Sequence, residues 1–229
     1  TLVLAVSLLI LSKMGDMYGR KRVFLASIVI FVIASAVNGM APNLLILNIG
    51  RAVQAIGGAG MNSLAMALVA SNFSGRQRGL ALGILGSVIG MSTASGPLIG
   101  GYLVGQFGWS SIFYVNVPVG IITVLLTIIY VKETPSYGAH DRIDFAGMLL
   151  SAATLFSLIY GLIQKEGHPH WNWTSPSVAA WLGAAVLLFA LFIYVEAHVQ
   201  APMVNLAMFK SRHFIGTIVV AFTLGVAIY

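Results

Sequence analysis

The chain has 229 residues, of which 59% are apolar and only 8% are charged, with a mean hydropathy of +0.94. Soluble domains are about 25% charged, so this composition excludes a soluble enzyme, and zero cysteines exclude disulfides and thiolate metal sites. The net charge of +6 indicates cytoplasmic loops of a membrane protein, which are rich in Lys and Arg, and not a nucleic-acid site.

Apolar runs of about 19 residues or more recur along the chain, each long enough to cross a hydrocarbon layer of about 30 Å as a helix. We expect an all-α, polytopic transmembrane helical bundle, because lipid offers the backbone no hydrogen-bond partners and the alternation of a barrel is absent. Both ends of the chain lie inside apolar stretches, so we expect a fragment of a longer chain. Hydropathy predicts these membrane segments: 1–12 and 214–229, both cut short, and 23–41, 44–71, 79–104, 112–131, 145–163 and 177–196.

Positive charge is concentrated in the loops that follow alternate segments. Ten of the twelve Lys and Arg residues lie there, one (Lys165) lies in an intervening loop, and Arg51 lies inside a segment. By the positive-inside rule these loops face the cytoplasm, and we expect a multi-pass protein of the plasma membrane. The tryptophans fall at the opposite, outer ends, where indole rings anchor helices at the headgroups: Trp109, Trp171, Trp173 and Trp181.

The first predicted cytoplasmic loop, of about ten residues between segments 1–12 and 23–41, reads S-K-M-G-D-M-Y-G-R-K-R. Asp16 and Arg20 are four residues apart and can pair, while Gly15 and Gly19 allow close backbone approach. A simple basic loop would explain the cations but not an acid between two glycines. The residues alone therefore leave two interpretations open: a paired, closely packed loop, and a basic loop with an incidental acid.

Segment 44–71 carries a polar stripe within one arc of about 120° on a helix, which predicts a face toward a cavity or a partner: Asn48, Arg51, Gln54, Gly58 and Asn62. Arg51 lies about 10 Å below the outer interface by helical rise, and an arginine in the bilayer costs at least about 2.5 kcal/mol. Intramembrane ionisable residues are functional by default. The alternative is an arginine tied to carbonyls of neighbouring helices.

Segment 79–104 combines a small-residue seam with a proline. Gly86, Gly90 and Ala94 share one face at four-residue spacing, which favours close helix contact but also fits ordinary packing. Pro97 cannot donate to the carbonyl of Thr93, so a kink or loosening is expected there. The proline stands in a rarer run: Gly96, Pro97, Leu98, Ile99, Gly100 and Gly101.

These patterns resemble signatures of the major facilitator superfamily. Its loop motif G-x-L-x-D-R-x-G-R-R/K is matched at Asp16, Gly19, Arg20 and Lys21, although Ser12, Met14 and Met17 depart from it. The resemblance implies that this loop is a gating latch that holds the outward-facing state. Arg51 and Gln54 match the motif l-x-x-x-R-x-x-q-G, which implies proton coupling. Since arginine keeps its proton, it would act by pairing with a carboxylate outside these segments and shifting its pKa.

The proline run of segment 79–104 is similar to the end of g-x-x-x-G-P-x-x-G-G, the motif of exporters in the superfamily. It implies a flexible, leak-proof seam against the other half of the transporter. Later stretches, G-W-x-x-x-F-x-x-N-x-P-x-G from Gly108, D-x-x-G from Asp144, and the run from Glu196 to Phe214, resemble the fourteen-helix drug:H⁺ antiporters (EmrB/QacA-like). Asp144 is equally suited to cap a helix.

The family resemblance implies a domain organisation along the whole chain. Residues 1–131 would form most of the N-terminal six-helix half, 132–144 a cytoplasmic loop, 145–196 two linking helices, and 197–229 a cytoplasmic link and the start of the C-terminal half. The sequence has no nucleotide-binding loop and no hydrolase or zinc-protease motif. We therefore expect neither an enzyme nor a metal or cofactor site.

The function that the resemblance implies is proton-coupled export of small amphipathic or cationic drugs by alternating access. The expected partners are the small-molecule substrate, protons and the lipid bilayer, with no nucleic acid and a monomeric protein. One alternative is a facilitator, or an exporter of a siderophore, sugar or amino acid. The other, from a different class, is a non-transporting membrane sensor or scaffold.

Overall fold

The computed structural model describes residues 2–134, 144–168, 170–199 and 206–228. The chain divides into two compact units, 1–141 and 142–229. Within the described ranges all regular structure is helical, and six helices are long and apolar enough to cross a membrane. The all-α membrane bundle expected from the sequence is thereby confirmed.

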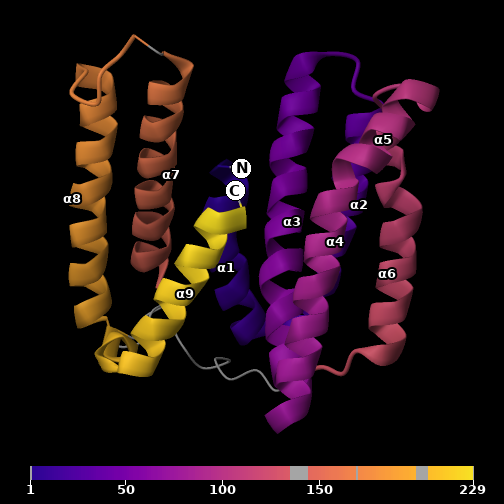
Figure 1. Ribbon diagram of the computed structural model, residues 1–229, viewed down its shortest axis with the longest axis horizontal. Coiled ribbons are helices and arrows are strands. Elements are labelled where there is room, and N and C mark those ends of the chain that lie inside the picture. The colour runs from indigo at the N-terminus through magenta and orange to yellow at the C-terminus, as the bar shows by residue number, and fades with distance from the viewer. Residues whose placement is uncertain (1, 135–143, 169, 200–205, 229) are drawn as a thin grey trace. The chain divides into compact units, whose positions relative to one another are not determined.

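The helices follow the predicted segments closely (Figure 1). The first unit contains α1 (Leu2–Tyr18), α2 (Arg20–Gly39), α3 (Leu44–Asn72), α4 (Gly75–Phe107), α5 (Ser111–Tyr114) and α6 (Asn116–Tyr130). The second contains α7 (Phe145–Gly167), α8 (Pro176–His198), the 3-10 turn η1 (Leu206–Lys210) and α9 (Arg212–Ile228).

The junction of α1 and α2 differs from the expected loop of about ten residues. Helix α1 continues to Tyr18 and α2 begins at Arg20, so only Gly19 separates them, with a φ of 102°. Hydropathy marks where a helix leaves the lipid, whereas its backbone hydrogen bonds continue until a residue turns the chain. Gly19 does so because it adopts positive φ without steric penalty.

Helix α3 lies at the centre of the first unit. It packs against α1 and α2, while α5 and α6 pack against α2. Asn43 starts α3 by accepting a hydrogen bond from the backbone N–H of Ile46 through its side chain (2.9 Å). The buried core between α1, α2 and α3 is small and aliphatic, and consists of Leu11, Val23, Ala59 and Leu64.

The predicted segment 112–131 is broken into α5 and α6. Pro118 has no N–H to donate to the carbonyl of Tyr114, and its ring crowds that carbonyl. The regular helix accordingly ends at Tyr114 and resumes at Asn116. By contrast, α4 runs uninterrupted through Pro97, because the loss of one hydrogen bond in a long helix does not end it.

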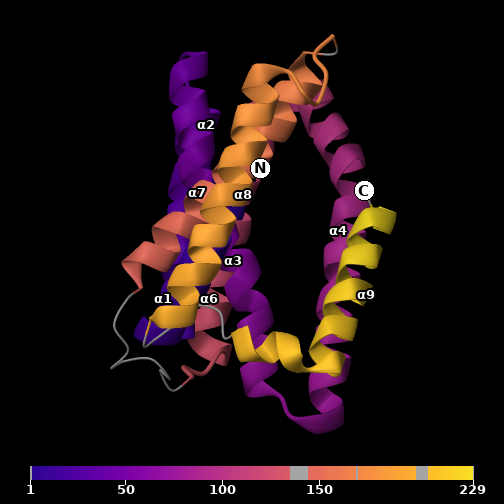
Figure 2. The same ribbon diagram turned by 90° about the vertical axis from the view of Figure 1, so that its left-hand side faces the viewer.

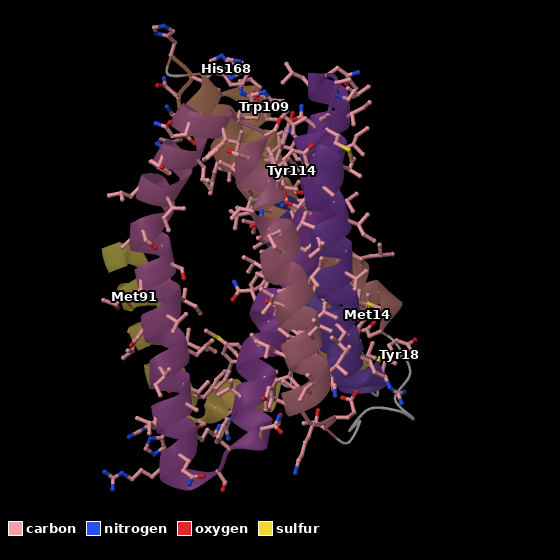
Figure 3. All side chains as sticks on the ribbon, turned by 90° about the vertical axis from the view of Figure 1, so that its right-hand side faces the viewer. Met14, Tyr18, Met91, Trp109, Tyr114 and His168 are labelled. Atoms are coloured by element: carbon pink, nitrogen blue, oxygen red, sulfur yellow. The ribbon has the colours of Figure 1, made fainter. Side chains whose placement is uncertain are left out.

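Helix α4 stands apart from the rest of the first unit along most of its length (Figures 2 and 3; Met91 marks the helix in Figure 3). It contacts α3 and α5, and none of its residues, all of which are described, is buried. Its large apolar side chains, such as Met91 and Leu98, are strongly exposed.

In the second unit, α7 and α8 form an antiparallel hairpin (Figure 1). The face of α7 toward α8 is made of small residues that are buried: Gly147, Ser151, Thr154, Ser157 and Gly161. Trp181 of α8 packs edge-on against Tyr160 with ring centroids 4.9 Å apart. Trp181 therefore contributes to the hairpin itself, in addition to the anchoring expected from its place near the outer end.

Candidate functional site

A cluster of polar side chains is buried where α2, α3 and the α5–α6 junction meet. Ser35 and Asn38 of α2 are fully buried, and Gln54 of α3 is 4% exposed. Polar groups in so apolar an environment are destabilising unless hydrogen bonds compensate for the lost water. Their bonds therefore define the site.

Gln54 is held at both ends of its amide. Its Oε1 accepts hydrogen bonds from Asn38 Nδ2 (3.1 Å) and from Arg51 Nη1 (3.2 Å), and its Nε2 donates to Ser35 Oγ (3.0 Å). Asn38 Oδ1 lies against Gly50, where any side chain would overlap it. Gly50 is thus the residue that lets α3 come close enough to α2 for the Asn38–Gln54 bond.

Ser35 connects this pair of helices to the α5–α6 junction. Its hydroxyl donates to the carbonyl of Phe113 (2.9 Å) and accepts from Gln54 Nε2 and from Asn116 Nδ2, both at 3.0 Å. A hydroxyl has one donor and two acceptor positions. The Ser35 hydroxyl uses all three.

Arg51 lies at the edge of this cluster and is exposed. Besides its bond to Gln54, its guanidinium carbon stands 5.5 Å from the centroid of the Phe113 ring, a cation–π arrangement. Within the described chain its contacts are therefore an amide oxygen and an aromatic face. Neither contact is a backbone carbonyl of a neighbouring helix, and the choice between the two interpretations of Arg51 stays a prediction.

The polar stripe of α3 does not keep to one environment. Gln54 turns into α2 and is buried, whereas Asn48, Arg51 and Asn62 are exposed and Gly58 is half-buried. On a helical wheel Gln54 is at the end of the arc, about 60° from Arg51. That edge faces α2, and the remainder of the arc is open in the described unit.

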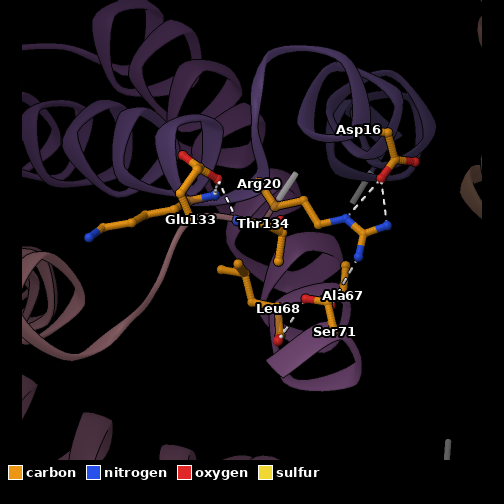
Figure 4. Close-up of polar contacts among 8 residues, drawn as sticks. Asp16, Arg20, Ala67, Leu68, Ser71, Glu133 and Thr134 are labelled. Atoms are coloured by element: carbon orange, nitrogen blue, oxygen red, sulfur yellow. Dashed lines mark hydrogen bonds and ion pairs between the residues drawn. The ribbon is translucent and has the colours of Figure 1, made fainter. Parts of the chain in front are cut away.

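The second cluster lies at the predicted cytoplasmic end, around the α1–α2 junction (Figure 4). Arg20 pairs with Asp16 through Nε (2.9 Å) and Nη2 (2.7 Å) to the same carboxylate oxygen, and its Nη1 donates to the carbonyl of Ala67 on α3 (3.3 Å). The pairing that the four-residue spacing allowed is present. The guanidinium thus ties α1, α2 and α3 together at one point.

Glu133 belongs to the same cluster and was missed by the sequence analysis. Its carboxylate accepts the backbone N–H groups of Lys21 (3.0 Å) and Arg22 (3.2 Å), while Lys21 Nζ donates to the carbonyl of Ile128 near the end of α6 (3.0 Å). The first N–H groups of a helix have no partner within it, and the N-cap, Gly19, has no side chain to offer. Glu133 takes the place of that cap.

The glycines of α4 that resemble the exporter motif do not pack closely against any described helix. A Cβ added at Gly86, Gly90, Gly96, Gly100 or Gly101 would meet nothing within 4 Å in the described chain. Close helix contact through glycine occurs instead on α3. The role of these glycines and of Pro97 as a seam stays a prediction.

At the start of the α7–α8 hairpin, Asp144 caps α7 by accepting the N–H of Gly147 (2.8 Å). Its expected capping role is confirmed. Glu196 of α8 is 3% exposed and lies beside the same glycine. Both acids lie at helix ends.

Comparison with known proteins places the whole chain. The model of the Major Facilitator Superfamily matches residues 1–229. The chain is 35% identical over 210 residues to the tetracenomycin C resistance and export protein of Streptomyces glaucescens, covering 92% of this chain and 38% of that protein.

Two further relatives align over 230 residues and 100% of this chain. Multidrug resistance protein Stp of Mycobacterium tuberculosis is 34% identical, with 42% of its length covered, and riboflavin transporter RibZ of Clostridioides difficile is 31% identical, with 47% covered. The chain spans less than half the length of each of these three relatives.

Proposed function

Because this chain belongs to the Major Facilitator Superfamily, and is thus a multi-pass membrane transporter sequence and not an enzyme, we propose that it acts in proton-coupled export. The substrates are small amphipathic or cationic compounds, and they leave the cell by alternating access of one half of the transporter against the other. Residues 1–131 supply most of the N-terminal half, 132–144 a cytoplasmic loop, 145–196 two linking helices, and 197–229 the entry into the second half.

The observation that carries this proposal is the environment of Arg51. It lies seven residues into α3, about 10 Å along the helix, and the residue is exposed while Gln54, which its guanidinium contacts, is buried. A cation facing lipid at that depth is expensive. A water-filled path or a carboxylate of another segment beside Arg51 removes that cost.

Proton coupling follows from such a carboxylate. Arg51 favours the ionised form of an acid beside it, so that protonation weakens the pair and lets the two groups separate. Each pH unit across the membrane supplies about 1.4 kcal/mol per proton. The uphill movement of substrate draws on that free energy.

The remaining motifs fit the same cycle. Arg20, paired with Asp16 and bonded to Ala67, holds α1, α2 and α3 together at the cytoplasmic end, which suits a latch that closes this side. The exposed glycine face of α4 suits a seam against helices of the other half. The protein acts as a monomer in the bilayer, because both of these surfaces serve contacts within one transporter.

The test is uphill accumulation of the cationic dye ethidium inside everted membrane vesicles that contain the full natural protein, which corresponds to export from the cell. We expect transport that collapses with a proton uncoupler and is lost in Arg51→Ala. Arg76→Ala is the matched control, since Arg76 is an exposed arginine at the start of α4 and should leave transport unchanged. Coupled efflux that survives in Arg51→Ala would contradict the role of Arg51.

A second candidate is export or facilitated passage of another small solute, such as a siderophore, sugar or amino acid. The similarity to a protein named as a riboflavin transporter favours this second candidate, because it indicates that related sequences transport different solutes. Solute movement that persists with the uncoupler and follows the solute gradient would identify a facilitator.

A further inference from the structure

We propose that Ser35 is a positioning residue: its hydroxyl fixes the orientation of the Gln54 amide, thereby holds Arg51 in place, and links Arg51 to Asn116 of α6. This inference rests on the proposed function for its consequence in transport, but not for its geometry. Ser35 itself lies beneath the surface at 0% exposure.

The direction of the hydrogen bonds shows how Ser35 helps to orient Gln54. The carbonyl of Phe113 only accepts, so the Ser35 hydroxyl must donate to it and has only lone pairs left for its other partners. Gln54 must then present its NH₂ group to Ser35, as it does at 3.0 Å. Consequently the carbonyl oxygen of Gln54 faces Arg51 and accepts from it.

Loss of the hydroxyl removes one of the groups that orient the Gln54 amide, and leaves the donors Arg51 and Asn38. The Gln54 and Asn116 amides would lose an acceptor and the Phe113 carbonyl a donor, all in a buried place where unmade bonds are costly. Rotation of the Gln54 amide would turn NH₂ toward the guanidinium, and two donors cannot bond each other. Of its contacts with described residues, Arg51 would then keep the one with the Phe113 ring.

The same bonds connect distant parts of the unit. Gln54 on α3 and Asn116 on α6 both donate to one oxygen on α2, and Phe113 meets Arg51 with its ring and Ser35 with its carbonyl. A displacement of the Arg51 side chain therefore alters the contacts of the α5–α6 junction. Movement of that junction in turn disturbs the anchor of Arg51.

The experiment compares Ser35→Ala with Ser27→Ala in the full natural protein. Ser27 is also a buried serine of α2, 2% exposed, but within the described residues its hydroxyl bonds only to the carbonyl of Val23 in its own helix. The first readout is the rate at which phenylglyoxal modifies Arg51, followed by mass spectrometry of that peptide. The second is the pH profile of ethidium efflux.

We expect Ser35→Ala to speed modification of Arg51 by a few-fold to about ten-fold, the range that one lost hydrogen bond corresponds to, and to shift the pH profile. Ser27→Ala should change neither. Asn116→Ala removes one bond to Ser35 and leaves its hydroxyl, so a smaller change in the same direction is expected even if Ser35→Ala folds poorly.

The outcomes separate the two proposals. Faster modification in Ser35→Ala, together with efflux that does not depend on Arg51, would support the positioning role and overturn the proposed function. Efflux that requires Arg51, with modification rates equal in Ser35→Ala, Asn116→Ala and Ser27→Ala, would overturn the positioning role and leave the proposed function standing.

Discussion

Glu133 shows how a single carboxylate can complete a helix that its own sequence leaves open. The acid accepts two backbone N–H groups at the start of α2. The donors are Lys21 and Arg22, which precede Glu133 by 112 and 111 positions in the chain. A negative charge there also interacts favourably with the positive end of the helix dipole. It thus fastens the segment after α6 to the α1–α2 junction.

We predict that Glu133→Ala exposes the start of α2. The amides of Lys21 and Arg22 should exchange with deuterium a few-fold to about ten-fold faster, because their only described acceptor is gone. Hydrogen–deuterium exchange with mass spectrometry measures this. Glu166→Ala, which removes an exposed acid at the end of α7, is the control and should leave these amides unchanged. Equal exchange in both variants would show that Glu133 is not the cap.

At the residue scale, sequence separation decided what could be predicted. Asp16 and Arg20 pair across four residues, so the spacing alone indicated the contact. Ser35 reaches Phe113 and Asn116 across 78 and 81 residues, and no local pattern specifies such partners. Polar residues within the apolar segment 23–41 were the available signal for Ser35 and Asn38, but they do not say what they bond.

At the scale of helices, the contrast lies between two sets of glycines. A Cβ on Gly57 of α3 would stand 2.7 Å from the backbone nitrogen of Phe31 and the carbonyl oxygen of Ser27 on α2, neither of which can move aside as a side chain can. The glycines of α4 meet nothing in the described chain. Glycine spacing therefore marks a formed seam on α3 and an open face on α4.

We predict that Gly57→Ala lowers the free energy of unfolding of the detergent-solubilised protein. The expected loss is about 1–3 kcal/mol, the usual cost of an overpacked core. Gly90→Ala should leave stability unchanged. The bulkier Gly90→Leu should also keep the stability of this unit while it abolishes ethidium efflux, if α4 seals against the other half. A large stability loss in Gly90→Leu without loss of efflux would contradict that assignment.

Helix positions were largely predictable because lipid demands long apolar helices, and every predicted segment overlaps a described helix. Two details were not. The extension of α1 to Tyr18 lies beyond the apolar run, where hydropathy carries no information. The break between α5 and α6 depends on Pro118, whose counterpart Pro97 breaks nothing in α4, so proline alone does not fix a break.

At the scale of the whole molecule, the family and its membrane architecture follow from composition and motifs, whereas the transport cycle requires surfaces that this chain supplies only in part. The open arc of α3, with Asn48, Arg51 and Asn62 exposed, and the open face of α4 both belong to the first unit. On α3, the apolar residues that line a groove with α2, such as Val53, lie on another side of the helix. One side is expected to meet water and the other lipid.

The central claim, that a water-filled path passes Arg51, is tested most directly by cysteine accessibility. The chain has no cysteine of its own, so Asn48→Cys, one helical turn from Arg51 toward the outer end, and Val53→Cys in the apolar groove can be compared in a background without other reactive cysteines. The account predicts that a charged, membrane-impermeant thiol reagent labels Asn48→Cys from outside, at a rate that changes when the proton gradient is collapsed, and spares Val53→Cys. No labelling at position 48 under any condition, or equal labelling at both positions, would contradict it.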